Sequence, residues 1–494
     1  MAFEIEEATI DSVHAAFQSK ALTAEALTEA YLARINAYDK NGPALNAVIT
    51  TNHAALEAAK DLDRHFADTG EFVGPLHGIP VVVKDQAETA GLRTTFGSTA
   101  MSDYVPTEDA TAIAKLKNAG AIILAKTTMP DFATSWFSFS SQSGQSKNPY
   151  DLDRDPGGSS SGTGASVAAN YATVGLGEDT GGSIRLPASF NNLVGLKVTP
   201  GLISRTGMSP LVVFQDSAGP MCRTVSDVAK TLNVIAGFDA ADPFTATASI
   251  AGPQDYTREL SSSALKGKTI GVVKQIFGDD SDDGAAAVNA IMGAAIKDLE
   301  KLGANPVEVE IPELDYYVDF TSLYVTHSRH DINQFLSKRA VPVKTVQEIH
   351  AAKQYHPQLD LFEALIEGPD DPTSEADYFE RYTARETFQR NLVNVMSQAG
   401  ASALMYPTTQ IPAPTHEDLA ANKWTTLTYP TNTLIAAQSW LPAISVPAGF
   451  TPSGVPVGME LMGLPYGEAS LLGLAFAYEQ GTRHRRAPKS CPAL

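Results

Sequence analysis

The sequence predicts an α/β protein with a central mixed β-sheet flanked by helices on both faces, and three observations support this. Apolar runs such as residues 79–83 are hydrophobic at every position, which is typical of strands buried on both sides. Segments with helical periodicity alternate with these runs along the chain. With 494 residues, 43% of them hydrophobic, the chain can bury a large core. We expect one large domain over residues 1–494.

Helical and extended segments alternate through the first half of the chain. Thr23 can cap a helix whose apolar stripe runs from Leu27 to Tyr38. The other predicted elements are a helix over 53–64, a strand over 79–83, a helix over 112–118, a strand over 121–125, a helix over 165–171, a strand over 173–176 and a helix over 224–237. Residues 133–164 are rich in Ser, Gly and Asn and lack periodicity, which indicates a functional or a disordered segment.

The second half continues the alternation, with one irregular region. Residues 238–267 are expected to form a surface connection. The elements predicted after it are a strand over 269–273, a helix over 285–302, a strand over 307–311, strands over 443–446 and 457–462, and a helix over 468–478. Residues 313–425 are the variable part, expected to be mostly helical and to cover a pocket as a lid or cap.

Charge and cysteine content exclude several classes of partner. The net charge of −20 disfavours nonspecific binding to nucleic acid or anionic membranes, since both need clustered Lys and Arg. Two cysteines, Cys222 and Cys491, do not make a disulfide framework, which fits a reducing compartment or a protein indifferent to redox conditions. The first residues lack an apolar leader, and no window has the roughly 18 apolar residues of a membrane span. We therefore expect a cytoplasmic protein without nucleic-acid or membrane partners.

A lysine ends the first predicted strand. Lys84 follows Pro80 and three valines, so it should lie deep in the protein. Burial would lower the pKa of its amine, and a neutral amine can act as a general base. The alternative is a lysine that reaches solvent from the end of the strand. This fragment alone leaves both interpretations open.

Two glycine–serine segments follow, GGSSSG at 157–162 and GGSIR at 181–185. Ser159 comes just before a predicted helix, where backbone N–H groups could converge on a polar group. Ser183 follows Thr180 and two glycines, which let successive N–H groups point the same way and hold a carbonyl oxygen that gains negative charge. For each segment taken singly, an ordinary loop or tight turn is the alternative.

Together the three segments can perform acyl transfer without histidine, cysteine or metal. Ser183 would attack the acyl carbon, Ser159 would pass the proton on, and neutral Lys84 would receive it. The same path would later return the proton to the leaving amine. This chemistry needs no cofactor, and we expect none.

With these residues in place, the chain resembles the amidase signature family. GPLHGIPVVVKD resembles its lysine strand, NPYDLDRDPGGSSSGTGASVAA its glycine–serine core and GEDTGGSIRLPASFNNLVGLKVTPG its nucleophile segment, with 24 positions from Ser159 to Ser183. The similarity continues through SAGPMCRTVSDVA, LPAISVPAGF and GVPVGMELMG, and is weakest over about 313–425. The resemblance implies the amidase signature fold and cleavage of linear carboxamides, or of similar anilides, carbamates or esters, through a serine acyl-enzyme.

The resemblance also implies residue roles, with Ser183 as nucleophile, Ser159 as bridging serine and Lys84 as base. It implies a cis peptide bond at Gly158–Ser159. The oxyanion hole would be formed by the backbone N–H groups of Thr180, Gly181, Gly182 and Ser183. Asp179 and Arg185 are expected to hold this loop by hydrogen bonds and charge pairing, with substrate contact as the alternative.

The substrate pocket is expected to take its shape from residues 129–145 and from the variable region. The candidate substrate contacts are Ala133, Thr134 and Phe137, and the further aromatic candidates are Trp136, Tyr316, Tyr317, Phe320, Tyr324 and Trp424. These residues favour an apolar pocket for aryl or bulky acyl groups. Ser160 or Ser161 could also hydrogen-bond the site.

Three further side chains leave alternatives open. Glu460 stands where many members of the family have glutamine, and it could affect the pocket or be a satisfied residue of the sheet. His327 and His330 are three residues apart on a predicted helix, a spacing that could serve a metal. No third ligand is suggested by the sequence, so we expect histidines that lie on the surface or line the pocket, and no metal site.

The leading functional hypothesis is therefore an amidohydrolase acting on a small-molecule amide. One alternative is the glutaminase-type subunit of a tRNA-dependent amidotransferase, which would pass ammonia to a partner protein. The other is a non-catalytic binding protein that keeps the amidase fold. A homodimer is an open alternative to a monomer.

Overall fold

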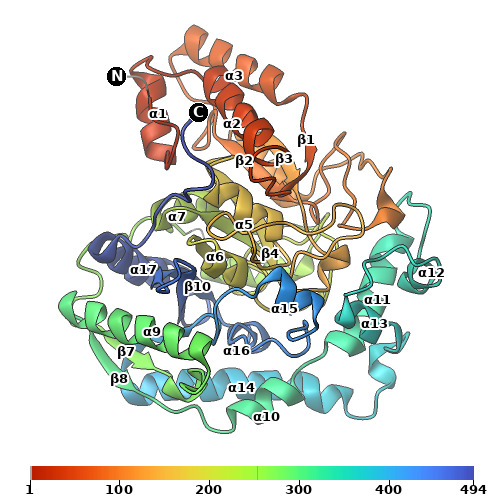
Figure 1. The fold of residues 1–494 in the computed structure, drawn as a ribbon, viewed down its shortest axis with the longest axis vertical. Coiled ribbons are helices and arrows are strands. Elements are labelled where there is room, and N and C mark those ends of the chain that lie inside the picture. Colours follow the sequence, from red (N-terminus) through yellow and green to blue (C-terminus); the bar gives the residue numbers. More distant parts are fainter. Residues whose placement is uncertain (1–2, 253) are drawn as a thin grey trace.

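An eleven-stranded mixed β-sheet runs through the computed structural model, which describes residues 3–252 and 254–494 (Figure 1). The strand order is β1-β3-β2-β4-β6-β5-β10-β11-β9-β7-β8. The strands are β1 (Val48–Thr51), β2 (Pro80–Lys84), β3 (Ile122–Thr127), β4 (Val174–Asp179), β5 (Val194–Lys197), β6 (Ser217–Cys222), β7 (Thr269–Val272), β8 (Asn305–Glu308), β9 (Ala401–Pro407), β10 (Ala443–Phe450) and β11 (Pro456–Met462). Parallel pairs join β3, β2 and β4 and also β9, β7 and β8, whereas the pairs between these groups are antiparallel.

Helices cover both faces of this sheet, which confirms the predicted fold class. On one face α4 (Thr111–Asn118), α7 (Val225–Ile235), α17 (Glu468–Thr482) and α9 (Asp283–Lys301) contact one another in a row. On the other face α5 (Ser161–Ala168) packs against α6 (Arg185–Phe190). The remaining helices are α1 (Ile10–Gln18), α2 (Ala24–Tyr38), α3 (Ala55–Thr69), α8 (Ala248–Ala251), α10 (Leu314–Phe320), α11 (Tyr324–Ser337), α12 (Val346–Ala351), α13 (Asp360–Ile366), α14 (Tyr378–Ala399), α15 (His416–Ala420) and α16 (Leu434–Gln438).

The elements with strong local signals form as predicted. The Thr23 side chain accepts the N–H of Ala26 and caps α2, whose apolar stripe is buried. Thr224 caps α7 in the same way through the N–H of Asp227. Every residue of β2 is buried, as expected for a central strand covered on both faces.

Other boundaries differ from the prediction because tertiary pairing decides them. β1, β5, β6 and β9 were not predicted, since they are short or carry Gly and Pro, and only pairing with neighbouring strands makes them extended. Because β9 belongs to the central sheet, the range 313–425 is not helical throughout. Helix α5 begins at Ser161 instead of 165, and β8 begins at Asn305 instead of 307.

Residues 133–164 are ordered, and most of them are buried. Asp155 shows how a polar segment can pass through the interior. Its carboxylate accepts the N–H and the hydroxyl of Ser138 and the N–H of Gly157. The structure therefore favours the functional interpretation of this segment over disorder.

The two ends of the chain lie side by side, near the N-terminal helices (Figure 1). Arg34 of α2 is fully buried and donates hydrogen bonds to the carbonyl oxygens of Cys491 and Pro492, at 2.7 and 2.9 Å. Nowhere in residues 3–252 and 254–494 does a helix combine the length and the apolar character that a membrane crossing requires.

Candidate active site

The sheet brings the three predicted segments to one place. β2 and β4 are neighbouring parallel strands, so Lys84 and the loop that follows Asp179 lie at the same edge of the sheet. The peptide bond before Ser159 is cis, as expected, and α5 begins two residues later. The N–H of Ser160 donates to the carbonyl oxygen of Ser183 at 3.2 Å, which fixes the two serine segments against each other.

Lys84 is buried, with no exposed surface, so the solvent-reaching alternative is wrong. Its Nζ lies 2.7 Å from Ser159 Oγ, 3.2 Å from the carbonyl oxygen of Glu178 and 3.4 Å from Glu178 Oε2. Burial lowers the pKa of the Lys84 amine, and the neighbouring Glu178 carboxyl opposes that shift. The amine is therefore placed to exchange a proton with Ser159.

The loop 180–183 is held through its carbonyl oxygens. The carbonyl oxygen of Thr180 accepts Gln215 Nε2 at 2.6 Å, and that of Gly181 accepts Thr433 Oγ1 at 2.6 Å. Because a carbonyl and the next N–H point in opposite directions, these bonds turn the following N–H groups away from Gln215 and Thr433. Within the described chain no acceptor engages the N–H of Gly181, Gly182 or Ser183.

Both glycines of this loop are required by its geometry. Gly182 has φ of +143°, a conformation that residues with side chains rarely adopt, and an added Cβ would overlap Thr433 Oγ1. At Gly181 an added Cβ would overlap the hydroxyl of Tyr324. The loop can approach these neighbours only because both side chains are absent.

Asp179 and Arg185 hold the two ends of the loop 180–183 together. Arg185 donates to both carboxylate oxygens of Asp179 at 3.0 Å, and Asp179 Oδ2 also accepts the N–H of Ile184 at 3.1 Å. Burial alone would raise the pKa of Asp179, but the Arg185 guanidinium outweighs it and holds that pKa below its ordinary value. Both side chains are fully buried, and neither lines a cavity next to Ser183, which favours the supporting role.

Glu460 of β11 completes this buried group. Its Oε1 accepts Arg185 Nη1 at 2.5 Å and the hydroxyl of Tyr406 at 2.9 Å. Burial raises the pKa of Glu460, and Arg185 opposes the shift. Glu460 Oε2 is buried and has no hydrogen-bond partner among the described residues, so the side chain is only partly satisfied. Because Glu460 does not line the cavity next to Ser183, the geometry still favours a residue of the sheet, in contact with Arg185, over a pocket residue.

A cavity of about 300 Å³ lies above Ser183. It is lined by Ala133, Ser135, Trp136, Gly181, Ser183, Leu211, Val318, Asp319, Ser322, Tyr324, Val325, Leu361, Thr426, Leu427, Tyr429, Leu434 and Gln438. Segments 133–136 and 318–325 thus form two of its walls, in the regions where the sequence placed the pocket. Most of the lining is apolar or carries only a hydroxyl.

Only some of the expected substrate contacts line this cavity. Ala133, Trp136 and Tyr324 line the cavity. Thr134 is buried beneath it and donates to the carbonyl oxygen of Asp131, and Phe137 packs edge-on against Tyr429 in the core. The other aromatic candidates pack elsewhere: Tyr316 against Phe320, Tyr317 against Phe388 and Trp424 against Tyr429.

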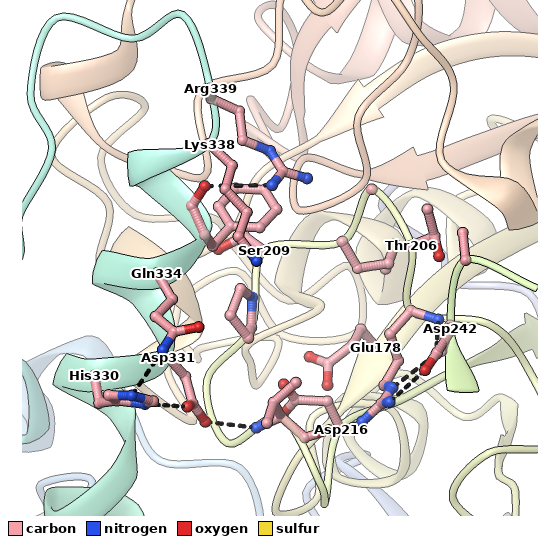
Figure 2. A pocket seen from close by; sticks show the side chains of 18 residues that line it. Glu178, Thr206, Ser209, Asp216, Asp242, His330, Asp331, Gln334, Lys338 and Arg339 are labelled. Carbon is pink, nitrogen blue, oxygen red and sulfur yellow. Dashed lines mark hydrogen bonds and ion pairs between the residues drawn. The ribbon is translucent and has the colours of Figure 1, made fainter. Parts of the chain in front are cut away.

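Sequence reasoning missed two buried carboxyl groups: Glu178, which contacts Lys84, and Asp216, which is linked to Glu178 through Thr180. Glu178 precedes Asp179 on β4, and Asp216 precedes β6, which pairs with β4. Both carboxyl groups line a second cavity of about 360 Å³, shown in Figure 2. The two cavities share no lining residue, so this one approaches Lys84 from a different side. Glu178 lies inside the segment GEDTGGSIR that also holds Ser183, but only the pairing of β4 with β2 reveals that it faces Lys84.

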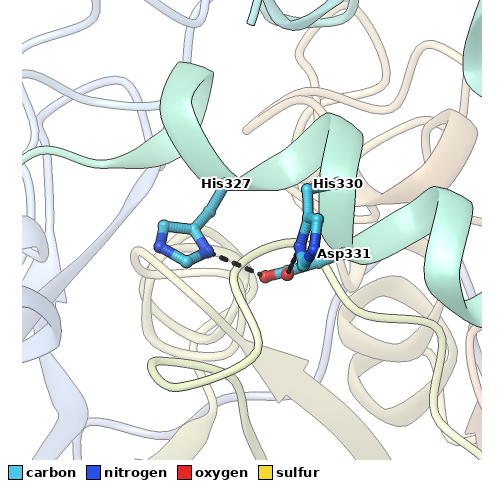
Figure 3. A group of neighbouring side chains, drawn as sticks. All are labelled: His327, His330 and Asp331. Atoms are coloured by element: carbon cyan, nitrogen blue, oxygen red, sulfur yellow. Dashed lines mark hydrogen bonds and ion pairs between the residues drawn. The ribbon is translucent and has the colours of Figure 1, made fainter. Parts of the chain in front are cut away.

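The two histidines of α11 lie beside a third side chain that could serve as a ligand, Asp331, which the sequence spacing did not suggest (Figure 3). Nδ1 of His327 lies 3.5 Å and Nδ1 of His330 lies 2.9 Å from the carboxylate of Asp331. His327 is buried, whereas His330 lines the second cavity. The three residues offer ligand atoms within 4.8 Å of one another, but Asp331 also accepts the N–H of Val213 at 2.8 Å. This hydrogen bond assigns the carboxylate a role in holding the loop before Asp216.

Ser160 and Ser161 do not contact the lysine in the same way as Ser159. Ser160 Oγ donates to the carbonyl oxygen of Glu178 at 3.2 Å and so ties α5 to β4. Ser161 Oγ is buried and has no hydrogen-bond partner within the residues that the structure describes.

Comparison with known proteins relates the chain to amidases over nearly its whole length. The family model named Amidase matches residues 26–472. The chain is 37% identical over 483 residues to a glutamyl-tRNA(Gln) amidotransferase subunit from Carboxydothermus hydrogenoformans, covering 96% of this chain and 97% of that protein.

Solved structures of amidase-type proteins share the fold of this chain. Native peptide amidase from Stenotrophomonas maltophilia superposes with a TM-score of 0.89 at 33% identity, covering 99% of this chain and 100% of that one. The corresponding glutamyl-tRNA(Gln) amidotransferase subunit from Thermotoga maritima superposes with a TM-score of 0.77 at 28% identity, with 99% of each chain covered.

Proposed function

The chain belongs to the amidase family, and on this premise we propose that it is an amidohydrolase that cleaves linear carboxamides through a Ser183 acyl-enzyme. The observation that carries the proposal is the 2.7 Å contact between Lys84 Nζ and Ser159 Oγ, directly behind the loop of Ser183. A buried amine that contacts a serine hydroxyl can accept a proton through it without histidine. The hydrogen bond from the N–H of Ser160 to the carbonyl oxygen of Ser183 supports placing the second serine next to this relay. Related anilides, carbamates and esters would react by the same route.

In the proposed mechanism Ser183 Oγ attacks the carbonyl carbon of the amide. Its proton passes to Ser159 Oγ while the proton of Ser159 passes to Lys84 Nζ. The N–H groups of Gly181 and Gly182 receive the oxyanion, an interaction often worth about 3–4 kcal/mol of barrier for each donor. The departing amine then takes the proton back through Ser159, and water repeats the cycle to release the acid.

The cavity above Ser183 supports an uncharged aryl or bulky acyl group as substrate. Trp136, Tyr324 and Leu361 lie on its walls, and apolar walls stabilise apolar groups by removing them from water. Among the cavity-lining residues that the structure describes, none is Lys, Arg or His. Its one acidic residue, Asp319, is exposed at the surface. An anionic acyl group would therefore lose its hydration without gaining a charge partner.

The amidotransferase alternative is supported by the 37% identity with an amidotransferase subunit. Two observations weigh against it. Glutamine carries an α-carboxylate, for which the described cavity offers no cation. The superposition with peptide amidase is also closer than that with the amidotransferase subunit of known structure. Turnover of glutamine alone, with no turnover of apolar amides, would favour the alternative.

The proposal is tested by Ser183→Ala. We expect this variant to lose amide turnover, whereas the purified wild type should be modified once by a serine-directed sulfonyl fluoride, measured by intact mass. Ser183→Ala should not be modified. Ser161→Ala is the matched control, because Ser161 Oγ has no partner within residues 3–252 and 254–494, and it should keep both turnover and labelling. Normal amide turnover by Ser183→Ala would refute the proposal, and unlabelled wild type without turnover would support a non-catalytic binding protein.

A further inference from the structure

We propose that Glu178 is a positioning residue that stands in its protonated form beside Lys84, so that the base stays uncharged while Asp216 carries the negative charge farther away. This inference rests on the proposed function, in which Lys84 must accept a proton. It concerns a carboxyl group that the catalytic steps above do not use.

The hydrogen bonds around Thr180 carry the assignment. Thr180 Oγ1 lies 2.5 Å from Asp216 Oδ1 and 3.1 Å from Glu178 Oε1. A threonine hydroxyl has one proton, so it can donate to only one of these two oxygens. The other contact is a hydrogen bond only if that carboxyl group supplies the proton. One proton is therefore shared by the two carboxyl groups.

The other partners decide which carboxyl group holds this proton. Asp216 accepts the N–H of Leu211 on Oδ2 at 3.0 Å and the N–H of Val212 on Oδ1 at 3.1 Å. Both of its oxygens are thus acceptors, which stabilises the carboxylate. In the described structure Glu178 accepts no backbone N–H at its carboxyl group, whose neighbours are the Thr180 hydroxyl, the Lys84 amine and the Gln86 side chain. The proton belongs on Glu178 Oε1, which donates to Thr180, which in turn donates to Asp216.

This arrangement leaves Glu178 Oε2 as a carbonyl-type acceptor facing Lys84 Nζ at 3.4 Å. A neutral acid can position the amine without favouring its ammonium form, whereas a carboxylate at this distance would favour the ammonium strongly. Burial lowers the pKa of Lys84 and raises the pKa of Glu178, which favours the uncharged pair. Burial and the neighbouring Glu178 also raise the pKa of Asp216, so the choice between the two carboxyl groups rests on the backbone N–H groups that Asp216 accepts. Glu178 thus holds the base in place without protonating it.

All but one of the other charged groups nearby are paired elsewhere, and the exception is Lys338, which is exposed and forms no ion pair within the described residues. Asp179, the next residue on β4, is paired with Arg185. The charged and titratable groups that share the second cavity with Glu178 and Asp216 are Arg205, Asp242, His330, Asp331, Lys338 and Arg339 (Figure 2). Arg205 pairs with Asp242, Arg339 with Glu88, and Asp331 with the two histidines. Within the described structure, Lys84 is the one cation in contact with Glu178.

The first test compares the acid limb of the pH profile of kcat/KM in three variants, using a chromogenic anilide. Glu178→Gln replaces a neutral acid by a neutral amide, so its acid limb should stay where it is in the wild type. Asp216→Asn removes the charge that keeps the proton on Glu178. Glu178 should then ionise and stabilise the Lys84 ammonium, moving the acid limb to higher pH by about 1–3 units. The double variant should restore the wild-type limb.

Two outcomes of this series would overturn the proposal. A limb that moves to lower pH in Glu178→Gln would mean that Glu178 is ionised in the wild type. If the acid limb of Asp216→Asn stayed where it is in the wild type, the charge of Asp216 would not control the protonation of Glu178 beside Lys84. Asp242→Asn is the matched control, since Asp242 lines the same cavity but pairs with Arg205, and it should leave the limb unchanged.

A second measurement needs neither turnover nor stable Asp216→Asn protein. The infrared difference spectrum between wild type and Glu178→Gln should contain the C=O band of a protonated carboxylic acid at neutral pH. Absence of that band would overturn the protonation of Glu178 without affecting the proposed function. Absence of amide turnover in the wild type would instead overturn the proposed function and leave the band to be tested.

Discussion

At the scale of single residues, burial decides what Lys84 can do. A lysine at the end of a strand usually extends its amine to water, but Lys84 is enclosed by Ser159 and by the backbone and side chain of Glu178. Desolvation lowers the pKa of the amine, so the neutral form is available at lower pH than for an exposed lysine. Activity is therefore expected to rise with pH as this amine loses its proton.

Lys84→Met should lower kcat by about 10²–10⁴-fold, the usual contribution of a general base. KM should change little, because Lys84 does not line the cavity above Ser183. Steady-state kinetics with an apolar anilide measure both quantities.

Lys126→Met is the matched control for that variant. Lys126 is a buried lysine on the adjacent strand β3 and contacts Asp85 rather than a serine. Its replacement should destabilise the fold but keep kcat for each folded molecule. An equal loss of kcat in both variants would assign Lys84 a structural role only.

At the scale of elements, the loop between β4 and α6 is held from several sides. Arg385 of α14 donates to Gln215 Oε1 at 2.5 Å, and Gln215 in turn donates to the carbonyl oxygen of Thr180. Thr433 donates to the next carbonyl oxygen, that of Gly181. These bonds fix the direction of the free N–H groups before any substrate binds, which is the condition for oxyanion stabilisation.

Gly181→Ala should lower kcat by about 10²-fold or more, because the new methyl group would overlap the Tyr324 hydroxyl and displace an N–H donor. Adding Tyr324→Phe removes that oxygen, so the double variant should recover part of the lost kcat. Kinetics of the single and double variants measure this coupling.

Gly293→Ala is the control for that substitution. Gly293 lies within α9 and nothing lies within 4 Å of an added Cβ. This variant should keep kcat and gain about 0.5–1 kcal/mol of stability, since alanine loses less backbone entropy in a helix. A double variant no more active than Gly181→Ala would contradict the proposed overlap.

At the scale of the whole molecule, an ion pair joins the N-terminal and C-terminal segments of the chain. Glu7 accepts both Arg485 Nη2 and Arg485 Nε, at 2.8 and 2.9 Å. Burial alone would raise the pKa of Glu7, but Arg485 outweighs it and lowers that pKa from 4.5 to about 2. The ionised carboxylate therefore stabilises the folded state at neutral pH.

Glu7→Gln should reduce the free energy of unfolding at neutral pH. The folded pKa lies below the ordinary value, so the contribution of Glu7 is present above about 4.5 and is lost as pH falls toward 2. The difference between wild type and variant should shrink across this window in urea unfolding. Glu4→Gln is the control, because Glu4 is exposed at the same end and forms no ion pair within the described residues. A difference independent of pH would contradict the assignment.

Local sequence patterns predict some elements of the fold and miss others. The α/β class, the capped helix α2 and the buried strand β2 follow from patterns within a few residues, and these were predicted. β6 reads SAGPMC, a segment whose extended form comes only from its pairing with β4 and β5. Local propensity is weak beside such pairing, so strands of this kind are not predicted from the sequence.

The sequence by itself determined the candidate reacting groups, since the segments that hold Lys84, Ser159 and Ser183 predict a base, a relay and a nucleophile. Only the tertiary structure decided which groups surround them. It placed Glu178 against the Lys84 amine, linked Asp216 to Glu178 through Thr180, and packed Phe137 in the core. The physical reason is that protonation and cavity shape depend on burial and on contacts between residues distant along the chain, which no local pattern encodes.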